Sequence, residues 1–323
     1  MNEFSCKALL MDLYTRYGRS MPFPGNSNFN EWQKAARIKI SELMKTVGTP
    51  KIPHLGTVFE TRIVEDKYVR EHVVLRTAPE LWMTAFILYK RDAPAKKDTL
   101  IILPEDGAGK FEEVWADDYE CVSAADVEKR KRIERNRTFA FEMADQNYLC
   151  VFPDTMGTGE RREWPDEGTT TFFKCSHRID NNVAIALGES LGGLIALETS
   201  RLCDYIESRN DSTSSIYVGG TGSGAIMAIL SALVDDRIEG VYVRSPLLSI
   251  KDSALETLSC CSCTTIPKLW QYFDNCDLAA MLAPKKLILS AKQKLHDDGT
   301  LEVIRQAYNE KGAISKLGFY DFQ

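Results

Sequence analysis

No stretch of the sequence approaches the roughly 20 consecutive apolar residues that a helix needs to cross a bilayer, so we expect no membrane partner. Positive charge is not in excess either, because 46 Asp and Glu outnumber 40 Lys and Arg, for a formal net charge of −6. A nucleic-acid partner requires a basic face, and this balance argues against one. No basic segment precedes the apolar patch near the N-terminus, so we expect no signal peptide and a cytoplasmic location.

Histidine is scarce, and the cysteines are not arranged in pairs. Four histidines occur, at positions 54, 72, 177 and 296, and nine cysteines are scattered along the chain. Without a secretory signal, such cysteines predict reduced thiols. The densest group is Cys260, Cys261, Cys263 and Cys276, which does not form two C-x-x-C pairs. That spacing argues against zinc, so we expect packed thiols, no metal and no cofactor.

The composition is that of an ordinary globular protein. Hydrophobic residues make up 44% of the chain and charged residues 27%, which excludes a disordered protein. A chain of 323 residues can bury about three quarters of its unfolded surface, so its core needs neither disulfides nor metal. The oligomeric state stays open.

The first 56 residues are interpreted as a helical N-terminal extension. Trp32, Ala36 and Ile40 recur at helical spacing, and Gly48 ends the pattern. We therefore expect this segment to be helical and polar.

The remaining residues, 57–323, are interpreted as an α/β domain. Three runs of period-two alternation predict antiparallel strands at one edge of a sheet, at 58–65, 69–77 and 81–90. From residue 99 onward predicted strands alternate with helices, at 99–103, 147–154, 214–220, 238–246, 284–291 and 316–323. This alternation predicts a mostly parallel sheet with helices on both faces. One intervening helix is predicted at 183–206, where apolar residues keep helical spacing over about six turns.

Several motifs fall at the carboxyl ends of the predicted strands, where a doubly wound sheet places its site. They are Gly107-Ala108-Gly109-Lys110, Pro153-Asp154 through Gly157-Thr158-Gly159-Glu160, a glycine-rich turn at 219–224, and DLAAMLAPKKLIL at 277–289. With these motifs the chain resembles the α/β-hydrolase superfamily, and within it the bacterial acetyl-xylan-esterase-like and dienelactone-hydrolase-like proteins that carry a helical N-terminal extension. The last stretch is the most specific, being similar to that family's DLAALIAPRPLLI. The resemblance implies an α/β-hydrolase fold and carboxylic ester hydrolysis.

The resemblance also implies a nucleophile elbow, G-x-S-x-G, on a tight turn between a strand and a helix. The sequence Gly220-Thr221-Gly222-Ser223-Gly224 stands in that context, but Gly222 occupies the expected nucleophile position. We therefore expect that the nucleophilic serine has been lost. The alternative is that Ser223 serves as a makeshift nucleophile. The same glycines do not match G-x-G-x-x-G, which argues against a dinucleotide site.

A second match to the elbow pattern is centred on Ser190, in Gly188-Glu189-Ser190-Leu191-Gly192. Because its flanks share one continuous helical period, we interpret Ser190 as a decoy inside a helix. The alternative is that Ser190 is the nucleophile.

The other expected members of a triad also depart from the family pattern. The acid implied by the resemblance follows the strand at 284–291, where both Asp297 and Asp298 stand. The implied histidine should follow the last strand, and the sequence carries none there, so the chain is either naturally short or a fragment. His296 is the candidate for a displaced base.

The oxyanion hole is expected from two loops, with Gly107, Ala108, Thr221 and Ser223 as donors. The family usually has a His-Gly pair after the first parallel strand, where this chain has Pro104-Glu105. A Glu105 side chain that points inward would disfavour a developing oxyanion.

These departures together predict an esterase-like protein with a degenerate site, weakly active or inactive, and so a pseudoenzyme. Its expected partner is a small-molecule ester or a carbohydrate-like ligand. The alternative is an active esterase that uses Ser223 or Ser190 with a displaced base such as His296.

Overall fold

The computed structural model describes residues 6–25, 28–45, 57–79, 81–105, 107, 109–110, 124–163, 175–256, 260–294 and 299–322. Within these residues, nine strands form one sheet in the order β1-β2-β3-β5-β4-β6-β7-β8-β9. Their bounds are β1 Thr57–Val64, β2 Tyr68–Ala78, β3 Leu81–Lys90, β4 Lys97–Leu103, β5 Leu149–Pro153, β6 Ser212–Gly220, β7 Ile238–Val243, β8 Lys286–Ser290 and β9 Leu317–Tyr320. Three pairs are antiparallel: β1–β2, β2–β3 and β3–β5. The other pairs are parallel: β5–β4, β4–β6, β6–β7, β7–β8 and β8–β9. The predicted mixed sheet with an antiparallel N-terminal edge is confirmed.

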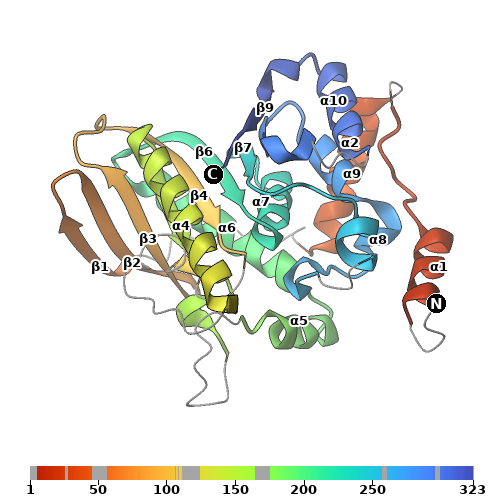
Figure 1. Ribbon diagram of the computed structural model, residues 1–323, viewed down its shortest axis with the longest axis horizontal. Coiled ribbons are helices and arrows are strands. Elements are labelled where there is room, and N and C mark those ends of the chain that lie inside the picture. Colours follow the sequence, from red (N-terminus) through yellow and green to blue (C-terminus); the bar gives the residue numbers. More distant parts are fainter. Residues whose placement is uncertain are drawn as a thin grey trace.

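The helices cover both faces of the sheet, as predicted (Figure 1). Their bounds are α1 Lys7–Tyr17, α2 Phe29–Leu43, α4 Ala124–Asp145, α5 His177–Ala186, α6 Leu191–Ser208, α7 Ser223–Val234, α8 Leu269–Tyr272, α9 Asn275–Ala280 and α10 Thr300–Glu310. Alternate strand residues point to opposite faces, so Ile101 packs in the larger core with α2, α6, α7, α9 and α10, and Ile102 packs with α4 on the other face. Two cores thus sandwich the sheet.

The N-terminal extension binds along the C-terminal half of the domain. Ile40 of α2 is fully buried in the larger core. The Gln33 side chain donates a hydrogen bond to the Met281 carbonyl (2.8 Å), and Arg19 forms a salt bridge with the buried carboxylate of Asp277 (2.9 Å). Arg19 and Gln33 therefore contact segments more than 240 residues away in the sequence.

The prediction of one continuous helix over 183–206 is wrong. The segment forms two helices, α5 and α6, whose axes are bent by 102°. The break falls at Gly188, which has φ +84°, a conformation that only glycine adopts without strain. Leu187 at the break is largely exposed, so the apolar spacing that suggested one helix does not reflect one buried face. The first of the two helices also begins earlier than the predicted range, at His177.

Among the described helices, none is both long and apolar enough to cross a membrane alone. The bent pair α5 and α6 reaches the required length and composition only when its two helices are taken together.

Candidate active site

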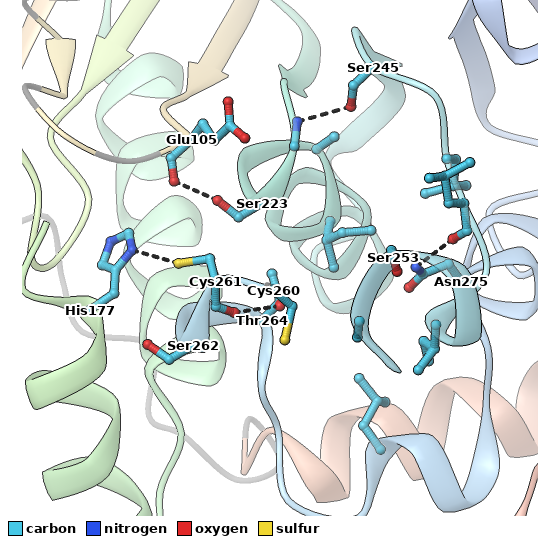
Figure 2. A pocket seen from close by; sticks show the side chains of 18 of the residues that line it. Glu105, His177, Ser223, Ser245, Ser253, Cys260, Cys261, Ser262, Thr264 and Asn275 are labelled. Carbon is cyan, nitrogen blue, oxygen red and sulfur yellow. Dashed lines mark hydrogen bonds between the residues drawn. The ribbon is translucent and has the colours of Figure 1, made fainter. Parts of the chain in front are cut away.

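A pocket of about 500 Å³ opens at the carboxyl ends of the central strands, where a doubly wound sheet places its site (Figure 2). Its floor contains Glu105 after β4, Gly222 and Ser223 after β6, and Ser245 after β7. Its walls come from α5, the segment 246–254, the loop 260–264 and the region around α8. The pocket therefore lies over the turn that sequence reasoning identified as the elbow.

The backbone of this turn has the geometry of a nucleophile elbow. Gly222 adopts φ 54° and ψ −121°, outside the regions that residues with side chains adopt without strain, and α7 begins at the next residue. Gly220 and Gly224 are required by close packing: a Cβ at either would overlap neighbouring backbone, and one at Gly224 would lie 2.8 Å from the Pro104 carbonyl oxygen. Thr221 closes the turn by accepting the N–H of Gly224 (2.9 Å). The scaffold of the elbow is complete, and its central side chain is missing.

The Glu105 carboxylate fills the place of that missing side chain. A Cβ built on Gly222 would overlap Glu105 Oε1 and would lie 2.6 Å from Cδ. Figure 2 shows Glu105 and Ser223 facing each other, and the Ser223 hydroxyl donates to the Glu105 carbonyl (2.5 Å). On the other side, the Gly222 N–H donates to Ser245 Oγ (2.9 Å). The carboxylate stands near the N-terminus of α7, where the helix dipole favours negative charge.

Ser190 lies elsewhere and has a structural role. It is buried, with 2% of its surface exposed, and it is the N-cap of α6. Its Oγ accepts the N–H of Gly193 (3.2 Å), which satisfies one of the free amides at the start of a helix. The serine of this second motif is a helix cap.

The loop that follows β4 is joined to the loop that follows β5 by a buried ion pair. Lys110 and Asp154 are both fully buried and form a short ion pair, and Lys110 Nζ also reaches Glu160 Oε2 (2.8 Å). A Cβ on Gly109 or Gly159 would overlap the Asp154 side chain. The glycines and the acid of the two sequence motifs are therefore needed to pack these loops together. Gly107 belongs to the same junction, because its carbonyl accepts the Gly159 N–H (3.1 Å).

A feature that sequence reasoning missed is a cluster of His177, Cys175 and Cys261 on the pocket wall. Nδ1 of His177 lies 3.1 Å from Cys261 Sγ, and the ligand atoms of all three lie within 4.8 Å of one another. Burial alone would lower the pKa of His177, but hydrogen bonds with the Cys175 and Cys261 sulfurs and their negative charge raise the pKa to about 10. The hydrogen bond to Cys261, followed by burial, raises the pKa of Cys175 to about 12. No spacing pattern in the sequence predicts the contact between His177 and Cys261, which are 84 positions apart.

Four of the sequence-predicted site residues lie outside the described part of the chain: Ala108, His296, Asp297 and Asp298. The structure places Gly222, Ser223 and Thr221 in one turn under the pocket, and it places Gly107 in the adjoining loop junction. Ser190 is not among the residues that line this pocket.

The chain matches a known protein family over almost all of its length. A model of the Abhydrolase family matches residues 5–323. A search of curated proteins finds no match. Solved structures that match include a candidate acetyl xylan esterase from Bacteroides fragilis NCTC 9343, with TM-score 0.78 at 18% identity, covering 98% of this chain and 82% of that one. A glucuronoyl esterase from Solibacter usitatus gives 0.57 at 14% identity, covering 88% and 81%. An acetyl xylan esterase from Paenibacillus sp. R4 gives 0.51 at 13%, covering 97% and 92%. At such identities these structures establish the fold alone, which is the α/β-hydrolase fold.

Proposed function

Because the chain belongs to the Abhydrolase family and has an esterase-like α/β-hydrolase fold, we propose that it keeps the pocket of an ester hydrolase but lacks serine-based ester hydrolysis, so that it is weakly active or inactive toward esters. The observation that carries this proposal is Gly222. The strained turn that normally presents a nucleophile is kept, while the side chain is absent and the Glu105 carboxylate stands in its place.

The two serines offered as alternatives are poorly suited to nucleophilic attack. Ser223 Oγ directs its proton to the Glu105 main-chain carbonyl, which cannot take up a proton as a base does. Ser190 is buried and caps a helix. An active esterase that uses either serine with His296 would have to rearrange these contacts first.

The proposed ligand is a small ester or a carbohydrate-like molecule, as in the relatives whose names describe esterases of xylan and glucuronoyl groups. The pocket lining supports this class, because it includes Trp270 together with the polar residues Ser245 and Asn275. Glu105 at the floor selects further, because a carboxylate accepts hydrogen bonds from hydroxyl groups and repels an oxyanion. We therefore expect hydroxyl-rich, uncharged ligands to be held without being cleaved.

Labelling with a serine-reactive fluorophosphonate, mapped by peptide mass spectrometry, tests the loss of serine chemistry, together with turnover of an aryl acetate. We expect no label and no turnover above buffer. A label on Ser223 or Ser190, with turnover lost on substitution of that serine by alanine, would overturn the proposal and establish a rearranged esterase.

Binding is tested separately by saturation-transfer NMR with an acetylated xylo-oligosaccharide. We expect a signal that Trp270→Ala removes, because Trp270 lines the pocket and an indole provides a large contact area for a ligand. Trp82→Ala is the matched control, since Trp82 is exposed on β3 and does not line the pocket. Equal signals in the two variants would refute binding in this pocket.

A further inference from the structure

Three soft ligand groups meet on the pocket wall, at the Cys175, His177 and Cys261 cluster. Two thiol sulfurs and an imidazole nitrogen lie within 4.8 Å of one another, and Figure 2 shows His177 and Cys261 pointing toward each other. Cys175 comes two residues before α5 and His177 is the first residue of α5, whereas Cys261 comes from a loop 84 residues beyond His177. All three line the pocket. Two distant segments therefore bring metal-ligating side chains together.

Asn181 holds these two segments in register. Its side chain is buried, and its amide donates to the Ser262 carbonyl (2.6 Å) and to the Thr265 carbonyl (3.2 Å). Its Oδ1 accepts the Leu191 N–H at the start of α6 (2.8 Å). The loop that carries Cys261 is thus fixed to the helix that carries His177. Hydrogen bonds of the buried Asn181 side chain, and not the chance approach of exposed side chains, hold the cluster together.

The imidazole of His177 is buried, and its polar contacts lie within the cluster. The residue is 2% exposed, and its Nε2 has no hydrogen-bond partner among the residues described. Its polar contacts go instead to the two thiols, through Nδ1 in the case of Cys261. The imidazole therefore directs its polar contacts to the cluster, and Nδ1 is the nitrogen that a metal ion at the cluster would use.

The geometry points to a Zn²⁺ site formed by Sγ of Cys175, Nδ1 of His177 and Sγ of Cys261. Zinc bonds of about 2.3 Å to sulfur and 2.0–2.1 Å to nitrogen in a tetrahedron require ligand atoms about 3.5–3.8 Å apart. The observed cluster meets this requirement with shifts of less than about an ångström, given its 3.1 Å contact and its 4.8 Å limit. Thiolate and imidazole ligands select zinc over magnesium or calcium, which prefer oxygen. Binding releases the thiol protons to solvent.

The fourth position of such a site would face the pocket that these three residues line. Three protein ligands with one open position are the pattern of zinc sites that accept water or a ligand group. Cys263, whose Sγ donates to Cys261 Sγ (3.1 Å), would act as a hydrogen-bond donor to a metal-bound thiolate. This inference does not rest on the proposed loss of serine chemistry, and either can fail without the other.

Equilibrium dialysis of the reduced, chelator-treated full chain against Zn²⁺, with metal counted by mass spectrometry, tests the site. We expect one zinc per chain, and a Co²⁺ complex with a thiolate-to-metal charge-transfer band. Cys261→Ser and Cys175→Ser should weaken binding by at least ~100-fold, beyond the effect of losing an outer-shell group. Cys260→Ser is the matched control, because this exposed neighbour lines the same pocket but is not in the cluster.

Circular dichroism of each metal-free variant checks that it is folded. If His177→Ala or a cysteine variant does not fold, the wild-type Co²⁺ spectrum and the rise of its Tm with Zn²⁺ still decide the matter. Zinc bound at far below one equivalent, a cobalt spectrum without thiolate bands, or equal losses in Cys260→Ser and Cys261→Ser would overturn the site. So would a Cys175–Cys261 disulfide in oxidised protein together with no metal binding in the reduced protein.

Discussion

Substituting Gly222 by alanine tests whether the Glu105 carboxylate occupies the place of a nucleophile. The backbone at φ 54°, ψ −121° costs a residue with a Cβ about 1–3 kcal/mol. The new methyl group would also overlap Glu105 Oε1, and displacing that side chain adds about 1–2 kcal/mol, in the lower range for overpacking. We therefore expect Gly222→Ala to lower the free energy of unfolding by about 2–5 kcal/mol.

In a Glu105→Ala background the same change should cost only the backbone strain, so the two substitutions should couple by about 1–2 kcal/mol. Urea unfolding followed by tryptophan fluorescence measures all three variants. Gly312→Ala is the control for positive φ without a neighbour, since Gly312 has φ +61° and nothing within 4 Å of its added Cβ. If the stability losses of the two single variants sum to that of the double variant within about 0.5 kcal/mol, Glu105 does not occupy this place.

Three further predictions concern parts of the molecule outside the elbow. Ser190→Ala should cost about 1 kcal/mol of stability through loss of the α6 cap and leave reactivity unchanged; a change in labelling with fluorophosphonate would contradict the capping role. Lys110→Met should cost about 3–5 kcal/mol in urea unfolding, because it leaves the Asp154 carboxylate buried without its cation, and a cost below 1 kcal/mol would refute the buried pair. Burial lowers the pKa of Lys285 from 10.5 to about 8, so the unfolded chain binds its proton more tightly than the folded protein does. Stability should therefore rise with pH between about 8 and 10.5, by up to about 3 kcal/mol, and this rise should be missing from the stability curve of Lys285→Met and present in the difference between wild type and variant.

Much of the fold could be predicted because hydrophobic periodicity follows burial. The period-two runs became β1, β2 and β3, and the short apolar runs became the buried parallel strands. The helix break was missed because Leu187 continues the apolar spacing although it is exposed. The signals of the break were nevertheless present: Gly188 fits a helix end and Ser190 a helix start. Here the sequence around a helix N-cap serine matches the G-x-S-x-G pattern of a nucleophile elbow.

The site was predictable where it depends on the local chain and not where it depends on distant contacts. The position of Gly222 followed from the strand, turn and helix around it. Whether Glu105 points inward could not be read from the sequence, because it depends on the loop after β4 meeting the turn after β6. The approach of Cys261 to His177 depends on folding across 84 residues, and no periodic pattern reports such a contact.

The docking of the N-terminal extension has a consequence for the order in which the protein can be completed during its synthesis. The Gln33 side chain bonds the carbonyl of a residue 248 positions later. At about 5–20 residues per second, a ribosome needs roughly 12 to 50 s to make that partner after Gln33 itself. For this time α2 can pack only on partners made earlier, such as the neighbouring Phe23 ring and then α7, and its contacts with the segment around Met281 are completed last.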